Sequence, residues 1–122
     1  MQRNLFFLVF AILFGCTYPD EGIRTDWTSL SLPGKALELI DDKESEWFPF
    51  SKEGTSSATI GTKNGPVAAP IFYWRITGNT LQISVFPDAE IFEELRNPAI
   101  KGNIISATRK SGVRARYTLS KL

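Results

Sequence analysis

The chain has few side chains that could carry out chemistry. Its 122 residues contain no histidine and a single cysteine, Cys16. Histidine is the usual general base at neutral pH and the commonest nitrogen ligand of zinc, so its absence excludes histidine-dependent triads and most zinc sites. One cysteine can form neither an intrachain disulfide nor a CxxC redox pair. Any chemistry must therefore come from carboxylates, hydroxyls or the lone thiol.

Two pairs of neighbouring carboxylates occur, Asp41 with Asp42 and Glu93 with Glu94. Neighbours in sequence point in different directions, whereas the two acids of a glycoside-hydrolysing site face one another across a cleft. Both pairs are therefore interpreted as solvated surface. The Ser and Thr residues form no GxSxG or SxxK motif, and no glycine-rich phosphate loop opens a helix. We expect no catalytic residue, no metal ligand and no cofactor, and so a protein that is not an enzyme.

The cysteine follows a short apolar run. Arg3 precedes ten apolar residues, Leu5 to Phe14, and Gly15 is the small residue expected before a cleavage site. The run is too short for a membrane-spanning helix, which needs about 20 residues. Residues 1–15 are therefore predicted to be a secretory signal peptide.

The residues LFGC, Leu13 to Cys16, resemble the lipobox of bacterial lipoproteins. This resemblance implies cleavage between Gly15 and Cys16, a thioether-linked diacylglycerol on Cys16 and acylation, for instance by palmitate, of the new amine. Two or three acyl chains hold a protein on a membrane nearly permanently. The alternative is an ordinary cleaved signal that leaves a free thiol near its cut.

The expected location is therefore the bacterial cell envelope, with the protein exported and held on the membrane by Cys16. Thr17 follows the cysteine instead of Asp, which by the same resemblance implies the periplasmic face of the outer membrane in a host with two membranes. Without residues 1–15, which include Arg3, the side-chain charges balance, so net charge predicts no partner. We expect no nucleic-acid partner and a monomer.

The rest of the chain divides into a tether and one domain. Residues 16–32 have many turn formers and no sustained period, and are predicted to be a tether with a late contact through Trp27. From residue 33 the pattern alternates with period two and has turn signals every eight to twelve residues, which is typical of an antiparallel all-β meander. Strands are expected at 35–40, 46–50, 56–62, 70–77, 80–86 and twice within 102–122.

One segment departs from the alternation. In 88–95, Asp88 could cap a helix on which Ile91, Phe92 and Leu95 share one side, so one short helix or turn is predicted there. The strands before it form the clearest hairpin, with Phe72, Trp74 and Ile76 facing the same side as Leu81, Ile83 and Val85 of the returning strand.

The charge distribution favours closure of the sheet into a barrel. From Lys101 onward there are six basic residues and no acidic one, whereas Glu38, Asp41, Asp42 and Glu44 cluster around the first strand. Pairing the last strand with the first would place opposite charges side by side and would remove exposed strand edges. We predict about seven to eight short strands in a small closed barrel. An anionic ligand or a membrane surface is the functional alternative for the basic strand.

The stretches EWFPFSKEGT, YWRITGNTLQI and YTLSKL resemble the small lipocalin-like lipoproteins of bacteria. The resemblance spans Lys35 to Leu122 and implies that 33–122 is a lipocalin-like barrel that binds a ligand. Trp47, Trp74 and Tyr117 are the candidates to line an aromatic ligand site, although strand aromatics are more often plain core. Arg75 is either a ligand anchor or an outward polar residue, and the outward interpretation is favoured.

Two non-enzymatic functions follow from these observations. The first is a lipid-anchored envelope protein that binds a small apolar ligand or an envelope protein. The second is an inhibitor or assembly factor that acts through its loops. A barrel of about eight strands has an interior that side chains can nearly fill, so we expect a packed interior with at most a shallow pocket at one end. The residues expected to fill it are Phe72, Trp74, Ile76, Leu81, Ile83, Val85, Val113, Tyr117 and Leu119.

Overall fold

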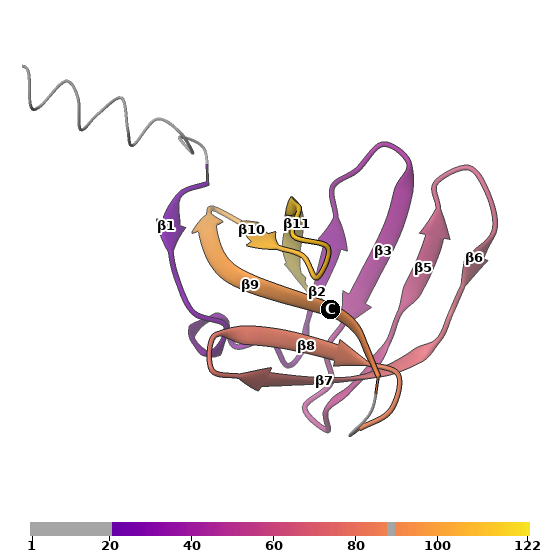
Figure 1. The fold of residues 1–122 in the computed structure, drawn as a ribbon, viewed down its shortest axis with the longest axis horizontal. Helices are drawn as coiled ribbons and strands as arrows, with labels where there is room; N and C mark the ends of the chain where they lie inside the picture. The colour runs from indigo at the N-terminus through magenta and orange to yellow at the C-terminus, as the bar shows by residue number, and fades with distance from the viewer. Residues whose placement is uncertain (1–20, 88–89) are drawn as a thin grey trace, which may run out of the picture.

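The computed structural model describes residues 21–87 and 90–122, which form one curled antiparallel sheet (Figure 1). The predicted signal peptide and Cys16 lie outside the described residues. The elements are β1 (Ile23–Arg24), the 3-10 helix η1 (Thr28–Leu30), β2 (Lys35–Leu39), β3 (Glu44–Pro49), β4 (Thr55–Ser57), β5 (Thr59–Thr62), β6 (Val67–Ala68), β7 (Ile71–Thr77), β8 (Thr80–Ser84), β9 (Ile91–Lys101), β10 (Ile104–Thr108) and β11 (Arg114–Lys121). The all-β, antiparallel fold class is confirmed.

The strands follow the order β4-β7-β8-β9-β10-β11-β2-β3-β5-β6, and β1 pairs with β9. The last strand, β11, pairs with β2, the first strand of the predicted meander, as expected from the sequence. Apolar side chains face each other at this junction, because Tyr117 lies opposite Leu39 and Leu119 opposite Leu37. Glu38 lies opposite Thr118, so the seam is not formed by the directly facing opposite charges that the sequence suggested.

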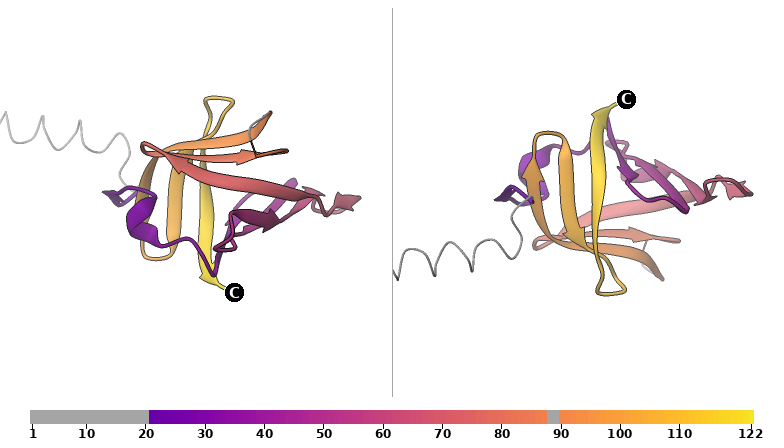
Figure 2. Two further views of the ribbon diagram at one scale, coloured as in Figure 1. Left: turned by 90° about the horizontal axis from the view of Figure 1, so that it is seen from below. Right: turned by 90° about the horizontal axis from the view of Figure 1, so that it is seen from above.

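The predicted closed barrel is wrong, because the sheet is an open half-barrel whose path ends at β4 and β6 (Figure 2). A single residue, Ala58, separates β4, which pairs with β7, from β5, which pairs with β3. The change of partner coincides with Pro70, which has no N–H for a ladder and accepts a hydrogen bond from the Ala58 N–H at 2.9 Å. This break divides the expected strand 56–62 into β4 and β5. The sheet has eleven strands instead of seven or eight also because β1, β6 and β9 form where no strand was expected.

The helix or turn predicted for 88–95 is wrong for its described part, because β9 begins at Ile91. In the β8–β9 pairing Ile83 lies opposite Glu93 and Ser84 opposite Ile91, so Phe92 is the extra residue of a β-bulge. The bulge shifts the inward–outward alternation of β9 by one position. The apolar residues Ile91, Phe92 and Leu95 therefore have the spacing of one face of a helix, although they lie in a strand.

A second irregularity bends β9 in its middle. Ser106 of β10 pairs with Ala99, but Thr108 pairs with Arg96, which leaves one more residue on β9 than on β10. Asn97 lies in this interval with φ 53°, in the left-handed region that asparagine tolerates better than most residues. Beyond this point β9 pairs with β1 instead of β8. The bend therefore gives one strand two partners along the same edge.

The concave face of the sheet buries the core, and the N-terminal segment covers one end of it. Trp27 is 0% exposed, and its indole N–H donates to the Leu95 carbonyl at 3.0 Å. Leu30 and Leu32 belong to the same core cluster. The described part of the expected tether, from residue 21 onward, is thus packed into the domain.

The hairpin of β7 and β8 has the predicted faces. Trp74 pairs with Ile83 and Ile76 with Leu81, and all four side chains contact the core cluster. Val113, also expected inside, is 62% exposed because it lies in the turn before β11.

Trp27→Ala should lower the free energy of unfolding by about 3 to 5 kcal/mol, because it leaves a large cavity at one end of the core. Urea unfolding followed by far-ultraviolet circular dichroism measures the loss. Trp47→Ala is the matched control, since Trp47 is only partly buried, and it should cost clearly less. Equal midpoints for wild type and Trp27→Ala would show that the N-terminal segment is not part of the core.

Candidate functional site

The candidate site lies at the end of the half-barrel that holds the turn between β10 and β11. Ile105 and Ala107 of β10 are buried in the core, and the two-residue period places Arg109, just beyond the strand, on the same inner side. The turn is fixed by the Arg109 N–H donating to Val113 O at 2.9 Å and the Gly112 N–H donating to Arg109 O at 2.8 Å. Gly112 has φ 93°, a conformation that glycine adopts readily.

Three carboxylates surround the Arg109 guanidinium, and we call this group the Arg109 network. Nη2 donates to Glu46 Oε2 at 2.7 Å, Nε to Glu93 Oε2 at 3.0 Å and Nη1 to Glu44 Oε1 at 3.3 Å. Glu44 and Glu46 come from β3, and Glu93 from β9. One side chain thus connects two strands that are not neighbours in the sheet.

The position of Glu93 corrects a prediction, since this residue was expected on the solvated surface. It is only 5% exposed, and Oε1 accepts hydrogen bonds from the backbone N–H groups of Lys110 at 2.7 Å and Glu94 at 3.0 Å. Its burial follows from regular alternation, because Glu93 lies two positions before the buried Leu95 and opposite the buried Ile83. Glu94 accepts from Gln82 and is partly buried.

Two buried polar atoms next to the network have no hydrogen-bond partner in the part of the chain described, Glu46 Oε1 and Tyr117 Oη. Burial raises the pKa of the Glu46 carboxyl; Arg109 opposes this, while Glu93 and Glu44 add to it. Burial also raises the pKa of the Tyr117 phenol. Burial alone would lower the pKa of Arg109, but its interactions with Tyr117, Glu46 and Glu93 raise it overall, so the guanidinium stays charged.

A recess of about 500 Å³, open to solvent, lies over the network, and we call it the mouth recess. Below it, Phe92 stacks on Phe72 with ring centroids 4.6 Å apart, and Phe48 contacts both rings. The recess combines an aromatic surface with charged groups and a hydroxyl. Its lining residues are Glu44, Phe92, Glu93, Arg109, Lys110 and Ser111.

The arrangement suits binding through hydrogen bonds and ion pairs. The Glu44 side chain is 56% exposed, so it can accept hydrogen bonds from a bound molecule while it contacts Arg109. The carboxylates converge on a guanidinium that occupies the space between them. Among residues 21–87 and 90–122 no group of three or more acidic, Cys or His side chains is arranged to hold a metal ion.

The four ligand-site candidates do not come together. Trp74 and Tyr117 face the core, where the Trp74 indole N–H donates to Ser51 O at 2.9 Å and its ring packs edge-on against Phe50. Arg75 is exposed, as favoured from the sequence, and its Nε donates to Gln82 Oε1 at 2.9 Å.

Trp47 lies outside the core cluster, between Glu38 and Thr59 of the flanking strands. Sequence reasoning thus identified Tyr117, which borders the Arg109 network, and missed Arg109 itself. The sequence did contain a signal for Arg109. Ile105 and Ala107 alternate as inward-facing residues, and continuing this alternation by two positions places Arg109 on the inner side.

The comparisons with known proteins add no relative, because no protein-family model, no curated protein and no solved structure matches this chain. The site is therefore described by its own geometry alone.

Glu46→Gln should change how stability depends on pH. Because the folded-state pKa of Glu46 is raised, its stabilising contribution is complete below the unfolded value of 4.5 and is lost as pH rises through the folded value. Glutamine stays neutral, so the stability of the variant relative to wild type should increase as pH rises from about 4 to 8. Urea unfolding at several pH values measures this difference.

The groups that face Glu46 are Glu44, Glu93, Arg109 and Tyr117, and all remain in the variant. Glu38→Gln, on the solvent-exposed side of β2, is the control and should show no such trend. A relative stability of Glu46→Gln that falls with rising pH would contradict the raised pKa.

Proposed function

We propose that this protein is an exported, non-enzymatic binding protein of the bacterial cell envelope, anchored by lipid on Cys16. It binds an envelope protein at the mouth recess and does not carry a small apolar ligand in its interior. The observation that carries the proposal is the filling of the half-barrel from end to end.

Three sets of side chains occupy the interior. Trp27 and its neighbours fill one end, the aromatic residues around Phe48 fill the middle, and the Arg109 network covers the other end. Four recesses in the part of the chain described have volumes of about 200 to 500 Å³, and each of these opens to solvent. A carrier of an apolar ligand needs an enclosed, mostly apolar cavity that covers most of the ligand.

The mouth recess suits a protein side chain better than a lipid. Three carboxylates face one guanidinium there, and the neighbouring Lys110 ammonium donates to the Ile91 carbonyl at 2.8 Å. The lining holds two acidic and two basic side chains, and Glu44 is the most exposed carboxylate of the network, so a basic or amide side chain of a partner would find a hydrogen-bond acceptor there. Phe92 supplies the apolar contact beside these groups.

The anchor rests on the LFGC junction. Cys16 lies five positions before Glu21, the first described residue, so an extended chain would hold the domain within about 17 Å of the lipid. In the described residues no helix has the length and apolar character needed to cross a bilayer. The alternative function is an inhibitor or assembly factor that acts through its loops. Identification of an enzyme as the protein that crosslinks to the mouth recess would favour this alternative.

Cys16→Ala should abolish labelling by a radioactive fatty acid and leave the signal uncut by the lipoprotein signal peptidase, because the thioether acceptor is missing. Detergent-phase partitioning of wild type and variant provides the measurement, with the wild type expected in the detergent phase. If the secreted wild type stays in the aqueous phase together with the variant, Cys16 is not an anchor.

A photo-crosslinking amino acid at Ser111, on the rim of the mouth recess, should give one discrete protein adduct in living cells of the host. Glu44→Lys should reduce this adduct strongly, because it reverses the charge of the most exposed carboxylate of the network. The same crosslinker at Ser29, in η1 of the N-terminal segment, is the control and should not give that adduct.

The competing carrier function has its own readout. Native mass spectrometry of the protein purified from its host should show no stoichiometric lipid beyond the covalent anchor, and added fatty acids should not quench its tryptophan fluorescence. A bound lipid that quenches Trp74 and is lost in Trp74→Ala would overturn the proposal.

A further inference from the structure

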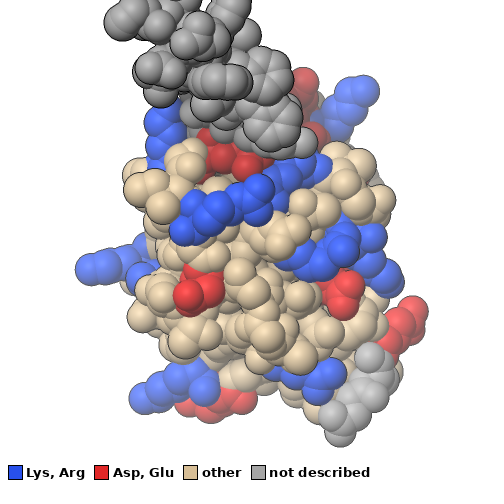
Figure 3. Space-filling view, turned by 60° about the vertical axis from the view of Figure 1, so that its left-hand side comes forward, with Lys and Arg blue, Asp and Glu red and all other residues tan. Residues whose placement is uncertain are grey.

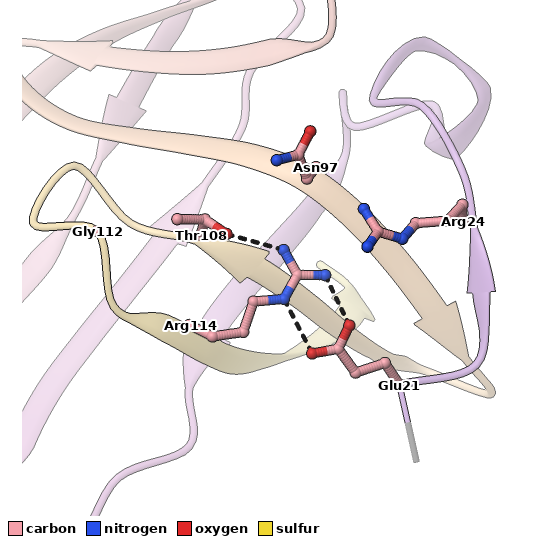
Figure 4. Close-up of a pocket in the computed structure, with 6 residues that line it drawn as sticks. All are labelled: Glu21, Arg24, Asn97, Thr108, Gly112 and Arg114. Atoms are coloured by element: carbon pink, nitrogen blue, oxygen red, sulfur yellow. Dashed lines mark hydrogen bonds and ion pairs between the residues drawn. The ribbon is translucent and has the colours of Figure 1, made fainter. Parts of the chain in front are cut away.

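A second recess lies on the outer side of the sheet and borders the same β10–β11 turn as the mouth recess. It has a volume of about 290 Å³, and we call it the outer arginine pocket (Figure 4). Its lining residues are Glu21, Arg24, Asn97, Thr108, Gly112 and Arg114.

Strand alternation explains why the arginines reach this side. Ala115 and Tyr117 of β11 contact the core, so Arg114 and Arg116 point outward. Arg114 pairs with Thr108 of β10, which also faces the pocket. β1 adds Arg24 opposite Ala99, just beyond the bend of β9.

A carboxylate from the N-terminal segment already occupies part of the pocket. Arg114 Nε donates to Glu21 Oε2 at 2.9 Å and Nη2 to Oε1 at 2.8 Å, which is the two-pronged geometry by which arginine binds planar anions. Nη1 donates to Thr108 Oγ1 at 3.0 Å. The hydrogen bond from Arg114 lowers the pKa of Glu21; partial burial opposes this, and the charges of Arg114 and Arg24 add to it.

The second guanidinium of the pocket is not neutralised in the same way. Arg24 extends toward Glu21 and Arg114 in Figure 4, but makes no hydrogen bond or ion pair within the part of the chain described. Among the described residues that line the pocket, two positive side chains thus face one carboxylate. On the face that carries β1, a band of Lys and Arg side chains crosses the upper part of the molecule, with carboxylates beside it (Figure 3).

From this geometry we infer that the outer arginine pocket binds a phosphate-type oxyanion, for which the Glu21 carboxylate is an internal substitute. Phosphate accepts the same paired hydrogen bonds from Arg114 as a carboxylate does. It also has further acceptor oxygens, so it can engage Arg24 and the Thr108 hydroxyl together. An external phosphate group therefore displaces Glu21 and satisfies both guanidinium groups.

The phosphate could belong to a lipid headgroup or to a free anion. A headgroup is the source we favour, because Glu21 is five residues beyond Cys16 and a lipid on that cysteine would keep the pocket near the bilayer surface. This choice of source rests on the proposed anchor. The pocket itself does not, since its residues all lie in the described domain.

The test is a titration of the full-length, detergent-purified protein, with arginine Nε–H resonances observed by NMR after ¹⁵N labelling. One arm uses inorganic phosphate and the other glycerophosphoglycerol, the soluble headgroup of phosphatidylglycerol. Sodium chloride at equal ionic strength corrects for screening. Arg24→Gln should weaken binding by about tenfold, the loss expected for a hydrogen bond to a charged group. Glu21→Gln should strengthen it, because the internal competitor loses its charge.

Two variants of equal charge change control for the general electrostatic attraction of anions. Arg116 lies two positions after Arg114 in β11 and lines no part of the pocket, so Arg116→Gln should change the affinity for phosphate less than twofold. Glu38→Gln should not reproduce the gain of Glu21→Gln. Binding of glycerophosphoglycerol supports a headgroup, whereas binding of inorganic phosphate alone supports a free phosphate.

Shifts no larger than those caused by chloride, or an equal loss in Arg116→Gln and Arg24→Gln, would overturn the inference. Neither result depends on Cys16, so failure here is distinguishable from failure of the anchor.

Discussion

The ion pairs of Arg109 are the interaction on which the arrangement of the mouth depends. Arg109 joins β3 to β9 through Glu46 and Glu93, although β10, β11 and β2 separate these two strands in the sheet. Burying such charges costs solvation free energy, which the mutual attraction repays only when the geometry is good. Loss of one partner would leave an uncompensated buried charge.

The opposite end is held by a different kind of contact. Trp27 is completely buried, and its indole N–H satisfies the Leu95 carbonyl. The apolar cluster around Trp27 fills one end of the half-barrel, and the Arg109 network fills the other. Side chains therefore occupy the interior between these ends. For the binding function that we propose, this packing favours contacts on the surface, where hydrogen-bonding groups are available, over a dry cavity.

The two candidate sites use the same residue types on opposite faces of the sheet. Arg109 points inward and is surrounded by three carboxylates, whereas Arg114 points outward and pairs with one carboxylate, that of Glu21, near Arg24. The sequence shows both arginines as members of one basic C-terminal stretch. Their different environments arise because strand alternation sends each to a different face and because distant segments, β3 and the N-terminal residues, supply the acids.

Local patterns in the sequence were sufficient for the features that depend on neighbours in the chain. Alternation and turn residues predicted the all-β class and the hairpin of β7 and β8, and the pairing of the last strand with the first strand of the meander was also correct. The class and the hairpin follow from a period of two, which any short segment displays by itself. The pairing of the first and last strands was predicted from their charges, but apolar side chains face each other at this junction. The signal peptide and the lipid on Cys16 remain predictions from the sequence.

The tertiary structure decided what depends on contacts between distant segments. The bulge at Phe92 interrupts the alternation before Glu93 and lets Phe92 also pack against the core, and the change of partner at Ala58 divides the expected strand 56–62. Trp27 joined the core although its segment has no periodic pattern. The packing of two strands that are distant in the sequence determines where a bulge or a change of partner occurs. The hydrophobic pattern within one strand therefore cannot predict it.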